Sequence, residues 1–247
     1  FKNNLMKVNP SKFQCLVLSR NNNCDILFNV DGVVLENMNC VKLLGCHIDN
    51  KLKFTDHVKQ LTVKCNRQVS VLGRLSTLLD IDTKLHIIRT LIIANLNYCS
   101  SVYHFCNVNE ARKLEKIVER ALRYAYHDFS SSYKELLVKS GFSSLFICRV
   151  RNIMVNVHKV RHNMLPPVNN LFEENHTEYD LRGTNLVQPM FNTVSYGLKS
   201  FRYTGATFYN KLPNDLKKMN VPDFKRAINL WKPKCNCNDC LLCSLNL

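Results

Sequence analysis

The feature that most constrains the fold is a helical pattern of apolar residues that begins near residue 55. Its members recur at steps of three and four residues, which places them on one face of a long helix. They are Val58, Leu61, Cys65, Val69, Leu72, Leu75 and Leu79. Lys64, Arg67 and Arg74 follow a second line along the same predicted helix. The chain must therefore bury one face of a long, basic helix.

Further helices are predicted after this one. A helix over residues 82–95 is apolar enough for the centre of a bundle, and another begins near Asn109. The helix from Asn109 carries a second basic set, formed by Lys113, Lys116, Arg120 and Arg123. The pattern is typical of a bundle of helices with basic outer faces.

Capping residues mark the ends of the later helices. Ser132 and Glu135 have the spacing of a capping box, and Gly141 is expected to end the short helix that they open. A long helix is predicted over residues 144–164, where two prolines follow it. A shorter amphipathic helix is predicted over residues 223–231.

The first fifty residues are predicted to form a small antiparallel β unit. Residues 13–19 have the composition of a strand, and the Asp31-Gly32 pair predicts a two-residue hairpin turn. Residues 41–48 form a further apolar strand with Gly45 in its middle. Glycine within a strand indicates a bulge or the close approach of another backbone, and both interpretations stay open.

The charge of the chain is strongly positive and unevenly placed. Lys and Arg number 34 against 19 Asp and Glu, so the formal net charge is +15. Residues 51–165 hold 19 basic and 8 acidic side chains, and 19 − 8 = +11 of this excess. Such an excess favours a polyanionic partner, most often nucleic acid. Because a single basic residue is usually a solvated one, the hypothesis depends on the two basic sets together.

Twelve cysteines divide into two groups. Eight stand singly within apolar patterns, as expected for core thiols in a reducing compartment. The other four, Cys235, Cys237, Cys240 and Cys243, lie close together near residue 247. Four thiolates can bind one zinc ion, and the alternative is a thiol-rich tail without metal. No membrane span is expected, because the longest apolar run, residues 86–96, is too short and contains Arg89.

These patterns predict an α+β chain that is mostly α. Residues 1–50 form the small antiparallel β unit, and residues 51–165 form the basic helical bundle. Residues 166–247 form an irregular C-terminal region with the Cys-rich tail.

An ordered series of stretches resembles the reverse transcriptases of non-LTR (LINE-type) retrotransposons of the jockey and CR1 kind. No single stretch is specific, but the series spans nearly the whole chain in a fixed order. It consists of residues 7–12, 41–49, 55–57, 114–123, 133–137, 196–203 and 212–213. The resemblance implies the end of a polymerase palm, with motifs D and E, followed by a thumb and a C-terminal region.

The resemblance also implies roles for individual residues. Lys12 matches the motif D lysine, a proposed proton donor to the leaving pyrophosphate, although a solvated turn lysine is an equal alternative. Leu44 and Gly45 match motif E, the primer grip. The basic helix matches the thumb, which holds duplex through its phosphates. The full set implied to bind nucleic acid is Lys42, Leu44, Gly45, Lys64, Arg67, Arg74, Lys113, Lys116, Arg120 and Arg123.

The metal-binding carboxylates of a polymerase are missing from this sequence. Two-metal catalysis needs Asp residues that hold Mg²⁺, and the family carries them upstream of motif D. The eleven Asp residues here include no adjacent pair. We therefore expect no polymerisation by this chain alone, and Mg²⁺ only in the full-length polymerase.

Two functions are expected from these observations. In the first, the chain binds an RNA or DNA primer–template, together with a missing N-terminal catalytic half of the same polyprotein, in the cytoplasm and nucleus. In the second, it is a stand-alone nucleic-acid- or zinc-binding module derived from such an element. A true thumb should prefer a recessed duplex end, whereas a module should bind without such preference.

Overall fold

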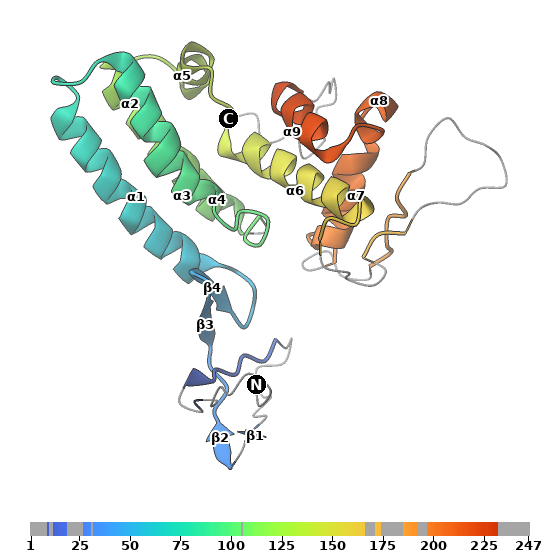
Figure 1. Cartoon of the computed structure of the whole chain (residues 1–247). Helices are drawn as coiled ribbons and strands as arrows, with labels where there is room; N and C mark the ends of the chain where they lie inside the picture. Colours follow the sequence, from blue (N-terminus) through green and yellow to red (C-terminus); the bar gives the residue numbers. More distant parts are fainter. Residues whose placement is uncertain are drawn as a thin grey trace.

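The computed structural model describes residues 9, 12–18, 27–30, 32–104, 106–165, 171–173, 185–191 and 197–231. Within these residues the chain is mostly helical, and two small antiparallel strand pairs lie below the helices in Figure 1. The predicted class, α+β and mostly α, is confirmed for the described part of the chain.

The first strand pair joins β1 (Phe28–Val30) to β2 (Val33–Leu35). Gly32, in the connection between them, has a φ of +81°, which suits glycine because other residues are strained there. The predicted hairpin is thus confirmed. The strand predicted over residues 13–19 is wrong for its described part, since residues 13–18 contribute one bridge, between Cys15 and Asn37.

The second pair consists of β3 (Cys40–Leu43) and β4 (Cys46–Asp49). The prediction of one continuous strand over residues 41–48 is wrong. The chain reverses at Leu44 and Gly45, whose φ angles are +47° and +84°. Positive φ at both central residues is the geometry of a tight hairpin turn. Gly45 therefore marks a reversal of the chain and not a bulge.

A helical bundle lies above the strands (Figure 1). It consists of α1, of α4, and of a third, continuous helical segment in which α2 is followed by a π-helical stretch, η3, and by α3. Their bounds are α1 (Thr55–Leu75), α2 (Ile81–Ile87), η3 (Ile88–Ile93), α3 (Ala94–Asn97) and α4 (Val108–Tyr126). Val58, Cys65 and Val69 of α1 are fully buried, so the predicted apolar face is confirmed as far as Leu72. Its last two members are wrong, because Leu75 is exposed and Leu79 lies beyond the end of the helix.

Side chains fix both ends of α1. The Asp49 carboxylate accepts hydrogen bonds from the backbone amides of Lys53 (3.0 Å) and Phe54 (2.6 Å), which holds the loop before the helix. After the helix, buried Lys84 donates its Nζ to the Ser76 carbonyl (3.1 Å). A cation at this position also offsets the negative end of the helix dipole.

The next two helices are α5 (Tyr133–Ser140) and α6 (Leu145–Arg161). The capping box of Ser132 and Glu135 is present, and Gly141 ends α5 with a φ of +66°, as predicted. Glu115 of α4 is buried and accepts hydrogen bonds from the Leu145 and Phe146 amides (3.2 and 3.0 Å). A carboxylate at a helix N-terminus is favourable, so Glu115 secures the start of α6.

A second apolar core lies where α6 meets the last helices. These are α7 (Phe201–Asn210), α8 (Asn214–Lys217) and α9 (Val221–Leu230). His158 of α6 is at the centre of this core and fully buried. Its Nε2 lies 2.9 Å from the Met219 carbonyl and its Nδ1 lies 2.7 Å from the Tyr209 hydroxyl. The ring also stacks on Phe224 at 3.9 Å. One histidine therefore connects three segments of the C-terminal region.

Candidate nucleic-acid interface

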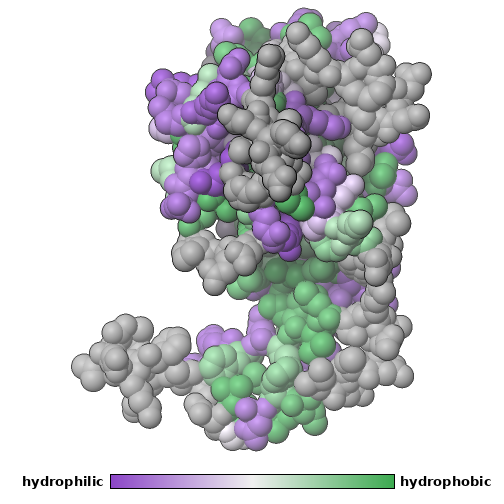
Figure 2. Space-filling model, turned by 90° about the vertical axis from the view of Figure 1, so that its right-hand side faces the viewer, coloured by the Kyte–Doolittle hydropathy of each residue, from purple (hydrophilic) through white to green (hydrophobic). Residues whose placement is uncertain are grey.

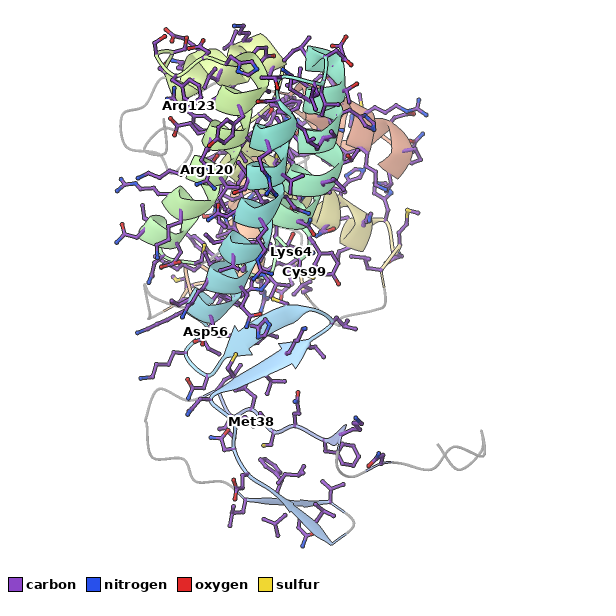
Figure 3. All side chains as sticks on the ribbon, turned by 90° about the vertical axis from the view of Figure 1, so that its left-hand side faces the viewer. Met38, Asp56, Lys64, Cys99, Arg120 and Arg123 are labelled. Atoms are coloured by element: carbon purple, nitrogen blue, oxygen red, sulfur yellow. The ribbon has the colours of Figure 1, made fainter. Side chains whose placement is uncertain are left out.

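The two basic helices, α1 and α4, run side by side in the same direction (Figure 3). Near their middles, the Arg120 guanidinium donates to the Asn66 side-chain oxygen at 2.5 Å. Nearer their C-terminal ends, Gly73 faces the Tyr124 ring, and a Cβ on Gly73 would lie 3.3 Å from that ring. The contact between the helices is thus close along its length, and their outer faces form one surface.

Cations dominate that surface. Eight basic side chains on these two fully described helices are exposed, namely Lys59, Lys64, Arg67, Arg74, Arg112, Lys113, Lys116 and Arg120. Asp56 is the one exposed carboxylate on the same two helices. The three glutamates of α4 are buried or half-buried. We call the eight exposed cations the α1–α4 basic face.

A shallow cavity of about 510 Å³ lies on the outer side of α1. Its described lining residues all belong to α1 and are Asp56, Lys59, Gln60, Val63, Lys64 and Arg67. Three of these six side chains are cationic, and Val63 supplies the exposed apolar part. A concave cationic surface concentrates anions, so this cavity is suited to a phosphate backbone.

The three basic residues predicted on α1 differ in orientation. Lys64 donates its Nζ to the Asn95 side-chain oxygen at 2.6 Å and so leans toward α3. Arg67 and Arg74 are exposed and form no ion pair with any described residue. The structure therefore leaves Arg67 and Arg74 available to a partner, while Lys64 lies at the edge of the face.

The four basic residues predicted on α4 also differ in exposure and in ion pairing. Lys116 and Arg120 are exposed, and Lys113 forms an ion pair with Glu110 at 2.7 Å. Arg123 is half-buried, and its Nη2 and Nε lie 2.6 and 3.2 Å from one oxygen of Glu119. Because this pair lies four residues apart on the helix, the charge of Arg123 is neutralised locally.

The predicted primer-grip residues lie in the turn between β3 and β4. Leu44 is 81% exposed, and its carbonyl accepts a hydrogen bond of 2.7 Å from the Tyr98 hydroxyl. Tyr98 directly follows α3, so this bond joins the turn to the helical bundle. Lys42 is exposed on β3 and pairs with His47 of β4. The turn is thus held at the end of the bundle where α1 begins.

Lys12 lies apart from the basic face, in the N-terminal β unit. Its side chain is exposed, and its backbone amide donates to the Asn9 carbonyl at 3.1 Å. The geometry is that of a turn lysine.

Four further residues of this surface did not stand out in the sequence. Lys59 and Arg112 are exposed cations on the same helices. Arg112 lies four residues before Lys116, and this spacing of about one helical turn is the signal that could have found it. Asn66 and Tyr98 act through long-range hydrogen bonds, which no local pattern indicates.

The predicted zinc ligands, Cys235, Cys237, Cys240 and Cys243, lie outside the described residues. Within the described part, no group of three or more His, Cys, Asp or Glu side chains is arranged to hold a metal ion. None of the helices described is both long enough and apolar enough to span a lipid bilayer. Comparisons with protein-family models, with curated proteins and with solved structures find no match to this chain.

Proposed function

We propose that this chain is the C-terminal part of a non-LTR retrotransposon reverse transcriptase, and that its α1–α4 basic face binds the primer–template duplex. The observation that carries the proposal is the composition of that face, with eight exposed cations and one exposed carboxylate over two parallel helices. Lys and Arg on a helical surface bind phosphates electrostatically and read no sequence. A polymerase thumb needs this property, because it must hold duplexes of any sequence.

The β3–β4 turn supports the same proposal. In this account the turn meets the primer terminus, and the basic face holds the duplex behind it. The hydrogen bond from Tyr98 to the Leu44 carbonyl fixes the turn relative to the bundle. A fixed backbone at the end of a basic surface is suited to positioning a primer strand.

Apolar surface on the N-terminal β unit favours a second partner. Leu27 is 69% exposed, Val34 is 55% exposed and Leu43 is 57% exposed. Figure 2 shows apolar surface at the level of the strands, below the helices. Large exposed apolar patches are typical of protein interfaces. We infer that the catalytic half of the polymerase, with the palm strands and the Mg²⁺-binding carboxylates, covers this surface. Lys12 would then lie beside the palm of the polymerase, where it could donate a proton to the leaving pyrophosphate.

Binding of three ligands across a salt series tests the proposal. The ligands are a duplex with a recessed 3′ end, a blunt duplex and a single strand, each followed by fluorescence anisotropy. We expect the recessed duplex to bind most tightly, with affinity falling steeply as salt rises. Equal affinity for all three would favour the alternative, a stand-alone nucleic-acid-binding module.

We propose separately that the four terminal cysteines hold one zinc ion. Thiolates are preferred zinc ligands, and Lys232 and Lys234 nearby favour their deprotonation. Metal analysis after purification under reducing conditions should find one zinc per chain. Cys240→Ser together with Cys243→Ser should release it, whereas Cys148→Ser should not. Absence of zinc from the unaltered chain would contradict the site.

A further inference from the structure

A second cavity lies beside a buried arginine and shares one lining residue, Arg112, with the α1–α4 basic face. Its volume is about 240 Å³, and it lies between the start of α4, α6 and the residues that lead into α7. Arg149 of α6 lines it and is 3% exposed. The walls are mainly apolar, with Val108, Phe146, Leu198 and Phe208 among them. The exposed cations Arg112 and Lys199 also belong to the lining.

Arg149 has no counter-ion among the described residues. Its Nε and Nη2 atoms are buried, and among the described residues they have no hydrogen-bond partner within normal distance, although the Cys106 thiol lies close to the guanidinium. These are the adjacent nitrogens on one side of a guanidinium, whose fork geometry matches the two oxygens of a carboxylate. A buried charge without a partner is strongly unfavourable, so an anion at this position would stabilise the fold.

The neighbouring side chains do not supply that anion. The guanidinium lies 5.2 Å from the centre of the Tyr103 ring, and burial raises the pKa of Tyr103, so its hydroxyl stays neutral. Burial also raises the pKa of Cys106, although the Arg149 charge opposes this shift. His104, another lining residue, has its pKa lowered to about 4 by burial and then by the Arg149 charge.

The carboxylate of Glu115 also lines the cavity, but it has other partners. It accepts hydrogen bonds from the Tyr133 hydroxyl at 2.7 Å and from the Leu145 and Phe146 amides. Its charge therefore serves the start of α6. Arg149 therefore forms no ion pair with Glu115 or with any other described carboxylate.

We propose that this cavity binds a small organic carboxylate, whose charge pairs with Arg149 and whose apolar part lies between Phe146 and Phe208. A ligand carboxylate would supply the hydrogen-bond acceptors that Nε and Nη2 of Arg149 lack among the described residues. The apolar walls favour an organic acid over inorganic phosphate, since several phosphate oxygens would face carbon there. The volume lies below the roughly 300–1,000 Å³ of pockets for drug-sized ligands, which favours a ligand the size of benzoate. Arg112 also belongs to the α1–α4 basic face, whereas Arg149 does not.

The test compares benzoate, its neutral analogue benzamide, and inorganic phosphate by calorimetry and thermal unfolding of the full chain. Benzoate should bind and raise Tm, while benzamide and phosphate should do neither. Arg149→Met should lower benzoate affinity by about tenfold or more, because the variant removes the charge with little change of volume. Without ligand the variant should be at least as stable as the parent, since an unpaired buried charge is removed.

A second variant keeps the test decisive if Arg149→Met does not fold. Arg112→Gln with Lys199→Gln changes two exposed residues and should weaken benzoate binding severalfold, whereas the matched pair Lys134→Gln with Lys139→Gln should not. Failure of the parent chain to bind benzoate, equal binding of benzamide, or unchanged affinity in Arg149→Met would overturn the proposal. Duplex binding by Arg149→Met should equal that of the parent chain, because Arg149 is buried and does not belong to the α1–α4 basic face.

Discussion

The Arg120 guanidinium of α4 donates a hydrogen bond to the Asn66 side chain of α1, a residue 54 positions earlier in the chain. The bond crosses the exposed contact between two parallel helices. It holds a cation of α4 beside the cations of α1, so the two sets form a single surface. The proposed duplex site depends on this arrangement more than on any one charge.

Replacing Arg120 should affect binding differently from replacing Arg123. Arg120→Gln removes an exposed charge that can contact a phosphate. The slope of log affinity against log salt concentration should therefore decrease in magnitude by about one. Arg123→Gln is the matched control, because Arg123 is already paired with Glu119. Anisotropy titrations of duplex DNA at several salt concentrations measure both slopes. Equal slopes for the two variants would contradict the assignment.

Removing the Tyr98 hydroxyl should loosen the β3–β4 turn. Tyr98→Phe loses the bond to the Leu44 carbonyl and should lower the free energy of unfolding slightly, because the bond lies at the surface. The preference for a recessed duplex end over a blunt duplex should also decrease, because the turn is no longer fixed to the bundle. Tyr203→Phe, in α7, is the control. An unchanged preference in Tyr98→Phe would argue against a primer contact at the turn.

The helical part of this fold was predictable because its signals are local. Apolar spacing alone places Val58, Cys65 and Val69 inside, and the Ser132 capping box forms within four residues. The strands were harder to predict from the sequence. Leu44 and Gly45 continue an apolar run, so Gly45 indicated a bulge or a close approach within one strand and not a reversal of the chain. Leu44 adopts a positive φ that is unusual for leucine.

Strand formation also depends on partners that a local pattern does not specify. Residues 13–18 have strand-like composition but make one bridge, through Cys15. Strand propensity is context-dependent because it reflects packing against neighbouring strands. The residues of the candidate site likewise include some that local spacing predicts and some that it does not. The cations of α1 and α4 could be found from spacing, whereas the contacts of Asn66, Tyr98 and Arg149 depend on which helices meet.

Stability should fall in mildly acidic solution because of His158. Burial is the main cause that lowers its pKa to about 4, and a neutral ring can accept from Tyr209 and donate to Met219. An unfolded histidine has a pKa near 6.5, so between about pH 6.5 and 4 the unfolded state binds more protons. The stabilisation is complete above about pH 6.5 and is lost as pH falls toward 4.

Urea unfolding at a series of pH values measures this effect. His158→Gln should flatten the curve in part and not fully, because burial also lowers the pKa of His104 to about 4. His86→Gln, on the exposed side of α2, is the control and should leave the curve unchanged. A curve that is flat over this range in the parent chain would contradict the neutral, hydrogen-bonded His158.

Charge reversal on α1 gives the sharpest test of duplex binding at the α1–α4 basic face. We expect Lys64→Glu, Arg67→Glu and Arg74→Glu together to weaken binding of the recessed duplex by about tenfold or more at low salt. The charge-matched control reverses Lys211, Lys218 and Lys225, which are exposed in the C-terminal region, and should retain most of the affinity. Unchanged binding by the α1 variant, or an equal loss in both variants, would contradict duplex binding at the α1–α4 basic face.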